Sequence, residues 1–272
     1  MSVIPDTDKV QDMIREVAEA AILPRFQSLQ AHEIDTKSGP QDLVTAADIE
    51  AEAMLKKMIE HTYPNALLIG EESVARGEVD LTKLYQDPPE HLFIVDPVDG
   101  TWNFAHGEDV FCVMMAYVHK GQGAIGWIYD PLKETGMIAE RGQGAYEDGK
   151  KLNCKNTPLS EAKGFIGMKY WPKKVHALLE ASSADAGEVS TLRCAGQEYL
   201  RLCRGVYNFA IYTKLNPWDH LAGTLAVREA GGRVALMDGG EYEFGRESGP
   251  LITAASQQLW DDVKETFISP LA

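Results

Sequence analysis

The sequence predicts a two-lobed protein of mixed helices and strands, with an α+β first half and an α/β second half. Two helical patterns followed by short β-rich runs fill the chain up to about residue 146. After about residue 153, strands and helices alternate, which is the pattern of an α/β unit. The length of 272 residues is one at which a single domain commonly gives way to two. We therefore expect lobes at residues 1–153 and 154–272, with no long linker between them.

The first lobe is expected to begin with two helices. Apolar residues recur every three or four positions from Asp8 to about Gln27, and again from about Ala46 to His61. The segment Lys37-Ser38-Gly39-Pro40 between them is expected to be a loop because it contains Gly and Pro.

Strands are expected to complete the first lobe. The short apolar runs at residues 66–69 and 92–95 predict buried strands. Residues 111–146 alternate β-rich runs with Gly-containing turns, which predicts an antiparallel meander.

In the second lobe, strands and helices are expected in turn. Strands are predicted at residues 165–168, 191–194, 206–212, 233–237 and 251–254, and helices at residues 173–184, 196–204 and 218–230.

The acidic composition restricts the partners of the protein. Its formal net charge is −15 at pH 7 and its pI is about 4.9. Nucleic acids and anionic membranes are bound by clustered Lys and Arg, so we expect neither as a partner. An anionic substrate would need bound divalent cations, because such ions reverse the local charge of a site.

Cysteine spacing and the N-terminal residues bear on chemistry and location. The sequence has no CxxC pair among its four cysteines, which are Cys112, Cys154, Cys194 and Cys203. It therefore indicates neither a zinc ribbon nor a thioredoxin-type redox motif, and we expect buried free thiols. Residues 1–6 do not resemble a signal peptide, and no apolar run approaches the roughly 18 residues that span a bilayer. We expect the protein in the cytoplasm.

Acidic residues follow both predicted strands of the first lobe. Gly70-Glu71-Glu72-Ser73 ends the first strand, and the segment Asp-Pro-Val-Asp-Gly-Thr at residues 96–101 ends the second. A third acid, Asp219, stands far downstream, and none of these acids has a basic residue beside it in the sequence. Carboxylates at strand ends without basic partners are typical ligands of hard cations.

The spacing within residues 96–101 suits a metal site. In a tight turn, Asp96, Asp99 and the carbonyl of Val98 can point at one location, and oxygen ligands of this kind suit Mg²⁺ or Mn²⁺. Gly100 and Thr101 then offer N–H groups and a hydroxyl in the manner of a helix N-terminus. Each motif also has an ordinary interpretation, as a turn or as a solvated helix cap. The occurrence of both at the ends of buried strands favours the metal site.

The chain resembles the inositol monophosphatase superfamily of magnesium-dependent, lithium-sensitive phosphatases. Residues 96–104 read Asp-Pro-Val-Asp-Gly-Thr-Trp-Asn-Phe and match the hallmark motif of the family in full. The segments at residues 42–48, 70–73 and 218–223 match three further family motifs in the right order. The resemblance implies a layered αβαβα sandwich of the sugar-phosphatase type, with the site between two lobes, and a homodimer.

The resemblance also implies two to three Mg²⁺ ions per site. Glu71, Asp96 and the Val98 carbonyl would hold the first ion. Asp96, Asp99 and Asp219 would hold the second, and Glu71 would serve a weaker third.

Catalytic and substrate-binding roles follow from the same resemblance. Glu71 and Thr101 would orient the attacking water, with Asp48 accepting a hydrogen bond from the Thr101 hydroxyl and no phosphoenzyme formed. The residues implied in substrate binding are Asp99, Gly100, Thr101, Gly196, Tyr212 and Asn216.

The substrate itself is left open by one departure from the family pattern. Tyr212 stands where inositol-specific members carry an acidic residue that hydrogen-bonds sugar hydroxyls, and polyol recognition depends on such paired polar contacts. Inositol 1-phosphate is the leading expectation, and histidinol phosphate, fructose 1,6-bisphosphate and 3′-phosphoadenosine nucleotides are the alternatives.

Three other side chains and two other classes of function bear on the prediction. Arg193 is a candidate for contacting a second anionic group, whereas His106 and Cys112 are expected to be structural. The protein could instead be a binding or regulatory partner, for instance of a transcription complex, with a vestigial metal site. A purely structural calcium site would leave Thr101 and Asp48 without a purpose.

Overall fold

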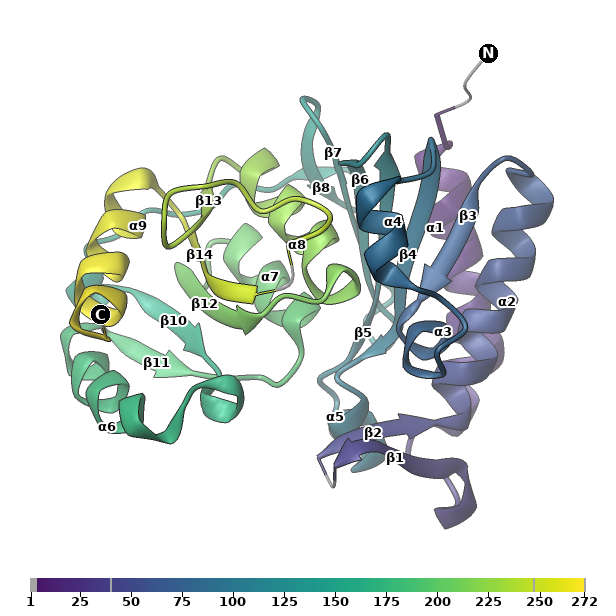
Figure 1. The fold of residues 1–272 in the computed structure, drawn as a ribbon, viewed down its shortest axis with the longest axis horizontal. Helices are drawn as coiled ribbons and strands as arrows, with labels where there is room; N and C mark the ends of the chain where they lie inside the picture. Colours follow the sequence, from purple (N-terminus) through teal and green to yellow (C-terminus); the bar gives the residue numbers. More distant parts are fainter. Residues whose placement is uncertain (1–3, 40, 247, 272) are drawn as a thin grey trace.

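The structure is a computed structural model that describes residues 4–39, 41–246 and 248–271. Two β-sheets alternate with layers of helices, so that the chain forms an αβαβα sandwich (Figure 1). This arrangement confirms the predicted fold class.

The larger sheet has seven strands in the order β3-β4-β5-β6-β7-β8-β9. Strands β3 and β4 are parallel, and each later neighbouring pair is antiparallel, which confirms the expected meander. Lys120 and Gly121 connect β5 to β6 with φ angles of 50° and 82°, as a two-residue hairpin turn requires. The strands are β3 (Leu67–Gly70), β4 (His91–Asp99), β5 (Cys112–His119), β6 (Gln122–Asp130), β7 (Thr135–Glu140), β8 (Gly144–Glu147) and β9 (Lys150–Lys151).

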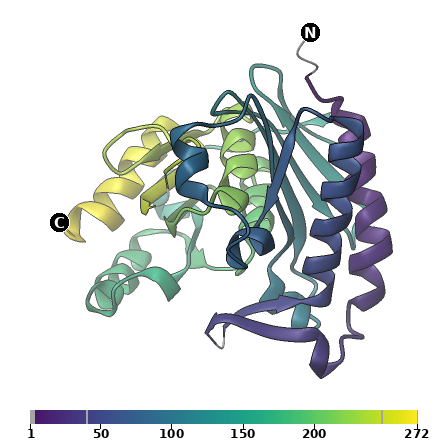
Figure 2. The same cartoon turned by 45° about the vertical axis from the view of Figure 1, so that its right-hand side comes forward.

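Two helices cover one face of this sheet, as Figure 2 shows. Helix α1 (Thr7–Val17) continues as a π-helical turn and a 3₁₀ turn up to Arg25, and α2 spans Ala46–Thr62. Both predicted helices are therefore confirmed. The Asp6 side chain begins α1 by accepting a hydrogen bond of 3.0 Å from the backbone N–H of Lys9.

A hairpin and three short helices lie at the edges of the larger sheet. Strands β1 (Ile34–Gly39) and β2 (Asp42–Thr45) pair in an antiparallel hairpin. The loop expected at Lys37–Pro40 is wrong for residues 37–39, which belong to β1. Gly39 pairs with Asp42, and Lys37 and Ser38 lie at an irregularity of the strand between Thr36 and Gly39; Pro40 lies outside the described residues. The sequence pattern did not predict the short helices, which are α3 (Glu71–Ala75), α4 (Leu81–Gln86) and α5 (Thr101–Ala105).

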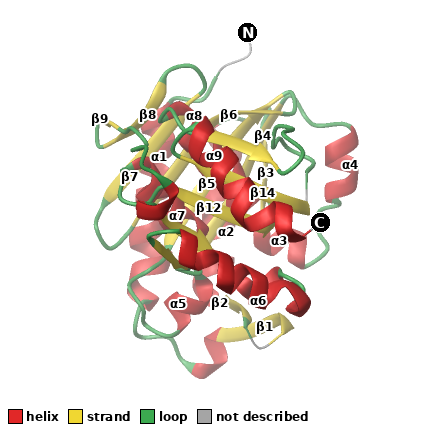
Figure 3. Cartoon of the chain, turned by 90° about the vertical axis from the view of Figure 1, so that its left-hand side faces the viewer, coloured by secondary structure: helices red, strands yellow, loops and turns green. Residues whose placement is uncertain are grey.

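The smaller sheet has five strands in the order β11-β10-β12-β14-β13. Helices α7 and α8 lie between the two sheets, and α6 and α9 cover the outer face of the smaller sheet (Figure 3). The elements are β10 (Lys163–Ile166), α6 (Lys173–Ser182), β11 (Glu188–Ser190), α7 (Ala195–Cys203), β12 (Phe209–Lys214), α8 (Pro217–Glu229), β13 (Arg233–Leu236), β14 (Ser248–Ala254) and α9 (Gln257–Val263).

The strand expected at residues 191–194 is wrong. Strand β11 ends at Ser190, and the N–H of Leu192 donates to Glu198 Oε1 at 2.8 Å instead of joining a sheet. Arg193 has a φ of 56°, which lies outside the extended region. The neighbouring strand β12 also begins three residues later than residues 206–212 predicted.

The two sheets share one continuous core. The larger sheet ends at Lys151 and the smaller begins at Lys163, but buried side chains from both pack together around α7 and α8. The division into lobes at residues 153 and 154 stays a prediction. Within the described ranges, no helix is long and apolar enough to cross a membrane.

Candidate metal centre

Three of the predicted acids meet between the sheets. Glu71, Asp96 and Asp219 each bring a carboxylate oxygen to within 4.8 Å of the other two. Because β3 and β4 are parallel neighbours, Glu71 at the end of β3 and Asp96 in β4 lie at the same edge of the sheet. Asp219 reaches them from the first turn of α8.

The electrostatics of this cluster favour a cation. Burial raises the pKa of Asp96 well above its usual value, and the negative charges of Glu71, Asp99 and Asp219 raise it further. The pKa of Asp219 is also raised, by burial and by Glu71 and Asp99, although Lys214 and Asn216 oppose the shift. Hard oxygen donors held this close fit a divalent cation, which would supply the missing positive charge.

A basic partner that the sequence did not reveal lies beside the cluster. Lys37 Nζ is 2.7 Å from Glu71 Oε1 and 2.6 Å from Glu72 Oε1. Burial by itself would lower the pKa of Lys37, but attraction to the two carboxylates outweighs it and raises the pKa. The inference that these acids have no basic partner is therefore wrong, because the β1–β2 hairpin brings Lys37 to them across 34 positions of sequence.

Another buried acid shapes the turn that carries Glu71. Glu52 of α2 accepts hydrogen bonds of 2.8 Å from the backbone N–H groups of Glu72 and Ser73. A Cβ at Gly70 would lie 2.1 Å from Glu52 Oε2, so this close approach requires glycine. The sequence pattern did not single out Glu52, although an acidic residue on the buried side of a predicted helix indicates a buried hydrogen-bonding partner.

Asp99 directs one oxygen away from the cluster. Its Oδ2 accepts hydrogen bonds from the N–H of Gly196 at 2.6 Å and from Cys194 Sγ at 3.2 Å. Burial raises the pKa of Asp99, and these hydrogen bonds oppose the rise. Asp99 is absent from the group of three carboxylates found among the described residues, and its role as a ligand stays a prediction.

The hydroxyl of Thr101 lies at the edge of the acidic cluster. It is 3.2 Å from Asp48 Oδ1 and 3.0 Å from the carbonyl oxygen of Val98, so its single proton can be donated to either. Burial raises the pKa of Asp48 to about 6, against hydrogen bonds from Thr45 that lower it. Gly100, which precedes Thr101, has a φ of 91°, and a Cβ there would lie 2.8 Å from the Val110 carbonyl oxygen.

The predicted substrate residues of the second lobe lie in different surroundings. Asn216 donates to Asp219 Oδ2 at 3.0 Å, which orients that carboxylate. Gly196 contacts Asp99 as described. Tyr212 packs its ring 4.7 Å from that of His220 and 5.3 Å from that of Tyr199. The contacts of Asn216, Gly196 and Tyr212 with substrate stay predictions.

The loop before α7 presents Arg193 to the motif that follows Thr101. The guanidinium of Arg193 lies 4.6 Å from the ring of Trp102, whose other neighbour is the stacked ring of His106 at 4.0 Å. Asn103 holds the loop by donating to the Leu192 carbonyl oxygen at 2.9 Å. His106 thus has a packing role, as expected.

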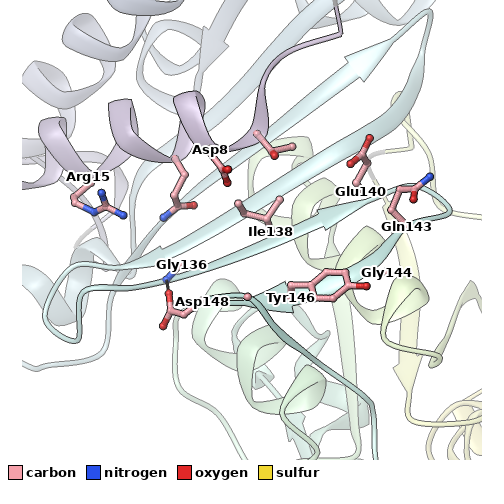
Figure 4. Close-up of a pocket in the computed structure, with 12 residues that line it drawn as sticks. Asp8, Arg15, Gly136, Ile138, Glu140, Gln143, Gly144, Tyr146 and Asp148 are labelled. Atoms are coloured by element: carbon pink, nitrogen blue, oxygen red, sulfur yellow. Dashed lines mark hydrogen bonds between the residues drawn. The ribbon is translucent and has the colours of Figure 1, made fainter.

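A groove of about 420 Å³ lies elsewhere, between α1 and strands β7 and β8 (Figure 4). Arg15, Ile138 and Tyr146 are among its lining residues, and none of the predicted site residues is. The groove is therefore separate from the acidic centre.

An acidic centre between the sheets of a five-layered αβ fold is the arrangement expected for the family of phosphomonoester hydrolases that the sequence motifs resemble. The chain belongs to the inositol monophosphatase family, whose family model matches residues 6–268. It is 34% identical over 222 residues to an inositol-1-monophosphatase of Mesorhizobium japonicum, covering 79% of this chain and 80% of that protein. It is 29% identical over 209 residues to a fructose-1,6-bisphosphatase/inositol-1-monophosphatase of Thermotoga maritima, covering 76% and 77% of the two chains. The structure of an IMPase of Thermotoga maritima superposes with a TM-score of 0.82 at 26% identity, over 96% of this chain and 95% of that chain.

Proposed function

We propose that the protein hydrolyses a small phosphomonoester with two to three Mg²⁺ ions, and that inositol 1-phosphate is its leading substrate. The observation that supports the proposal most strongly is the convergence of Glu71, Asp96 and Asp219 within 4.8 Å. Their oxygen donors and their unbalanced charge fit Mg²⁺, which prefers carboxylates together with water and substrate phosphate.

Magnesium bound at this centre would lower the pKa of a bound water and offset charge on the transferring phosphoryl group. The protein's own residues would position the reactants. When Thr101 donates its proton to Asp48, the lone pairs of its oxygen are free to accept a hydrogen bond from the attacking water. Glu71 would orient the same water. The phosphoryl group would pass directly to this water as the bond from phosphorus to the ester oxygen breaks and the alcohol leaves, without a phosphoenzyme.

The alternatives within this chemistry are histidinol phosphate, fructose 1,6-bisphosphate and 3′-phosphoadenosine nucleotides. Fructose 1,6-bisphosphate has specific support from one observation. A relative from Thermotoga maritima is named for both fructose-1,6-bisphosphatase and inositol-1-monophosphatase. Tyr212, which lacks the carboxylate with which inositol-specific members hold sugar hydroxyls, weakens the case for inositol 1-phosphate without favouring any one alternative.

A substrate panel tests the proposal. The four classes of phosphomonoester are assayed with Mg²⁺, with and without Li⁺, and Asp96→Asn serves as the inactive control. One substrate should be turned over far faster than the rest, and Li⁺ should inhibit that turnover. Equally slow turnover of every compound would show that the physiological substrate is missing, and wild-type rates no higher than those of Asp96→Asn would refute the assigned centre.

Tyr212→Glu separates the two leading substrates. The new carboxylate should raise kcat/KM for inositol 1-phosphate relative to fructose 1,6-bisphosphate, by roughly tenfold for one added polar contact. Tyr212→Gln, which offers hydrogen bonds without the charge, is the matched control. An unchanged ratio in both variants would place substrate hydroxyls away from residue 212.

The family also leads us to propose a homodimer, lithium sensitivity and a cytoplasmic location. Light scattering of the purified chain tests the dimer. A regulatory binding role is the alternative from another class, and a cellular effect that survives Asp96→Asn would support it over the enzyme.

A further inference from the structure

Among the described residues, a second cluster of ligand atoms includes Asp99. Cys112 Sγ and Cys194 Sγ are 3.8 Å apart, and Asp99 Oδ2 lies 3.2 Å from Cys194 Sγ and 3.7 Å from Cys112 Sγ. The two cysteines are 0% and 2% exposed and Asp99 is 7% exposed. The cluster joins β5, the loop before α7 and the end of β4.

The three distances match the edges of a tetrahedral zinc site. With Zn–S near 2.3 Å and Zn–O near 2.0 Å, tetrahedral angles place two sulfur ligands about 3.8 Å apart and a sulfur and an oxygen about 3.5 Å apart. The observed sulfur–sulfur distance of 3.8 Å agrees with the first value, and the sulfur–oxygen distances of 3.2 and 3.7 Å lie on either side of the second. A cation could therefore contact all three atoms without a large movement of the backbone.

We propose that Cys112, Cys194 and Oδ2 of Asp99 form a binding site for a thiophilic divalent cation of the Zn²⁺ class. Soft thiolate ligands select zinc over the magnesium that carboxylates and water prefer. On binding, each thiol releases its proton to solvent and a sulfur lone pair forms the bond to the metal, so no electron is transferred. The main-chain oxygen of Asp99, 3.4 Å from Cys194 Sγ, is a nearby candidate for the fourth position.

The local packing separates this pair of cysteines from the other pair. A Cβ at Gly196 would lie 2.4 Å from Cys112 Sγ, so glycine lets α7 approach the sulfur atoms and Asp99 closely. Cys154 and Cys203 also interact with each other, but they belong to no cluster of three metal-binding groups in the described part of the chain. The proposal is therefore specific to Cys112 and Cys194.

This site goes beyond the proposed phosphatase activity and would act on it. Asp99 is shared between the thiol cluster and the predicted set of magnesium ligands. A thiophilic cation on Oδ2 draws negative charge from that carboxylate and weakens its attraction for Mg²⁺. Zinc should therefore inhibit the enzyme in a way that depends on the two thiols.

Cadmium serves as an optical probe of the site, because cadmium–thiolate bonds absorb in the ultraviolet. The full chain is kept reduced with a phosphine and titrated with Cd²⁺ in excess Mg²⁺. Absorption should rise to a plateau at one equivalent, and Zn²⁺ added first should prevent the rise. Cys194→Ser and Cys112→Ser, whose hydroxyls can still hydrogen-bond Asp99, should each weaken Cd²⁺ binding by at least about tenfold. Cys154→Ser should bind as the wild type does.

The outcomes distinguish this site from its alternatives without an activity measurement. No absorption from the wild type at one equivalent would overturn the proposal. A signal that is lost in Cys154→Ser but kept in Cys194→Ser would assign the binding to the other cysteine pair and overturn it as well. Circular dichroism of each variant confirms that the fold is retained.

In the phosphatase assay, the Zn²⁺ concentration for half inhibition should rise by about tenfold or more in Cys194→Ser.

Discussion

Asp96→Asn should make the metal-free protein more stable while it removes activity. Asp96 is 3% exposed and lies within 4.8 Å of oxygen atoms of Glu71 and Asp219. Its Oδ1 also accepts a hydrogen bond of 3.0 Å from the N–H of Val98, which the Asn carbonyl can keep. The substitution therefore removes a charge and preserves the local shape.

The size of the gain follows from the geometry. At 4.8 Å, and with an effective dielectric constant near 20, each pair of like charges costs about 3.5 kcal/mol, so two pairs cost about 7 kcal/mol. The folded protein can avoid this repulsion by keeping Asp96 protonated, so the free-energy cost of that protonation is the upper limit. Holding Asp96 protonated at pH 8, against an ordinary pKa of 3.8, costs about 1.4 kcal/mol per pH unit, or about 6 kcal/mol. We expect Asp96→Asn to stabilise the metal-free protein by about 3 to 6 kcal/mol at pH 8.

The sign of the pH dependence follows from the raised pKa of Asp96. A carboxyl group whose folded pKa lies above its unfolded pKa binds protons more tightly in the folded state, so its unfavourable contribution is absent below pH 3.8 and grows as the pH rises toward the folded pKa. Relative to Asp96→Asn, the metal-free wild type should therefore lose stability from about pH 4 upward. Asp96→Asn should flatten that decline.

Urea unfolding at pH 4 and pH 8, with EDTA or with Mg²⁺, measures these differences. Mg²⁺ should stabilise the wild type and leave the variant nearly unchanged, while kcat of the variant falls at least about a thousandfold. Asp130→Asn is the matched control, because Asp130 is equally buried but is paired with Lys133 Nζ at 2.6 Å and Gln197 Nε2 at 2.8 Å. That variant should lose about 1–3 kcal/mol. If both variants lost stability equally in EDTA, the like-charge argument would be wrong.

Three further variants test individual contacts. Thr101→Ala should lower kcat by about a hundredfold or more with little change in KM, whereas Thr101→Ser should keep most activity; equal losses would remove the hydroxyl from the reaction. Gly196→Ala should cost about 1–3 kcal/mol in urea unfolding because its Cβ would lie 2.4 Å from Cys112 Sγ, and adding Cys112→Ala should restore part of the loss. Lys37→Met should destabilise the metal-free protein by about 3 kcal/mol, because it leaves Glu72 buried at 3% exposure without its cation; Lys37→Arg, which keeps the charge, is its control.

The sequence predicted those parts of the fold and site that depend on local pattern. The apolar runs at residues 66–69 and 92–95 became β3 and β4, and their parallel pairing brings Glu71 and Asp96 to one sheet edge. The helix expected at residues 218–230 became α8, which carries Asp219. In each case, burial required apolar residues at a regular spacing, and the acids stood beside them: Glu71 directly after β3, Asp96 within β4 and Asp219 in the first turn of α8.

Contacts that depend on the folded structure rather than on the local sequence pattern could not be predicted in this way. Residues 37–39 carry a loop-forming glycine, and only the folded β1–β2 hairpin shows that Lys37 reaches Glu71. Residues 191–194 have strand-forming Thr and Leu, but Glu198 binds the N–H of Leu192 and removes it from any ladder. The local preference was outweighed by the pairing of a short hairpin in the first case and by a side-chain hydrogen bond in the second.

The geometry of the centre connects its stability with its function. Glu71, Asp96 and Asp219 come from α3, β4 and α8, so each carboxylate is held by a different element. The rigid sheet and the middle helix layer therefore maintain a concentration of negative charge that the chain by itself would avoid. Lys37 neutralises part of that charge, through Glu71 and Glu72, while Asp96 and Asp219 keep raised pKa values. The remaining repulsion between the carboxylates is relieved only by a proton or a cation. Relief of this unfavourable free energy on metal binding therefore contributes to the binding free energy of the metal.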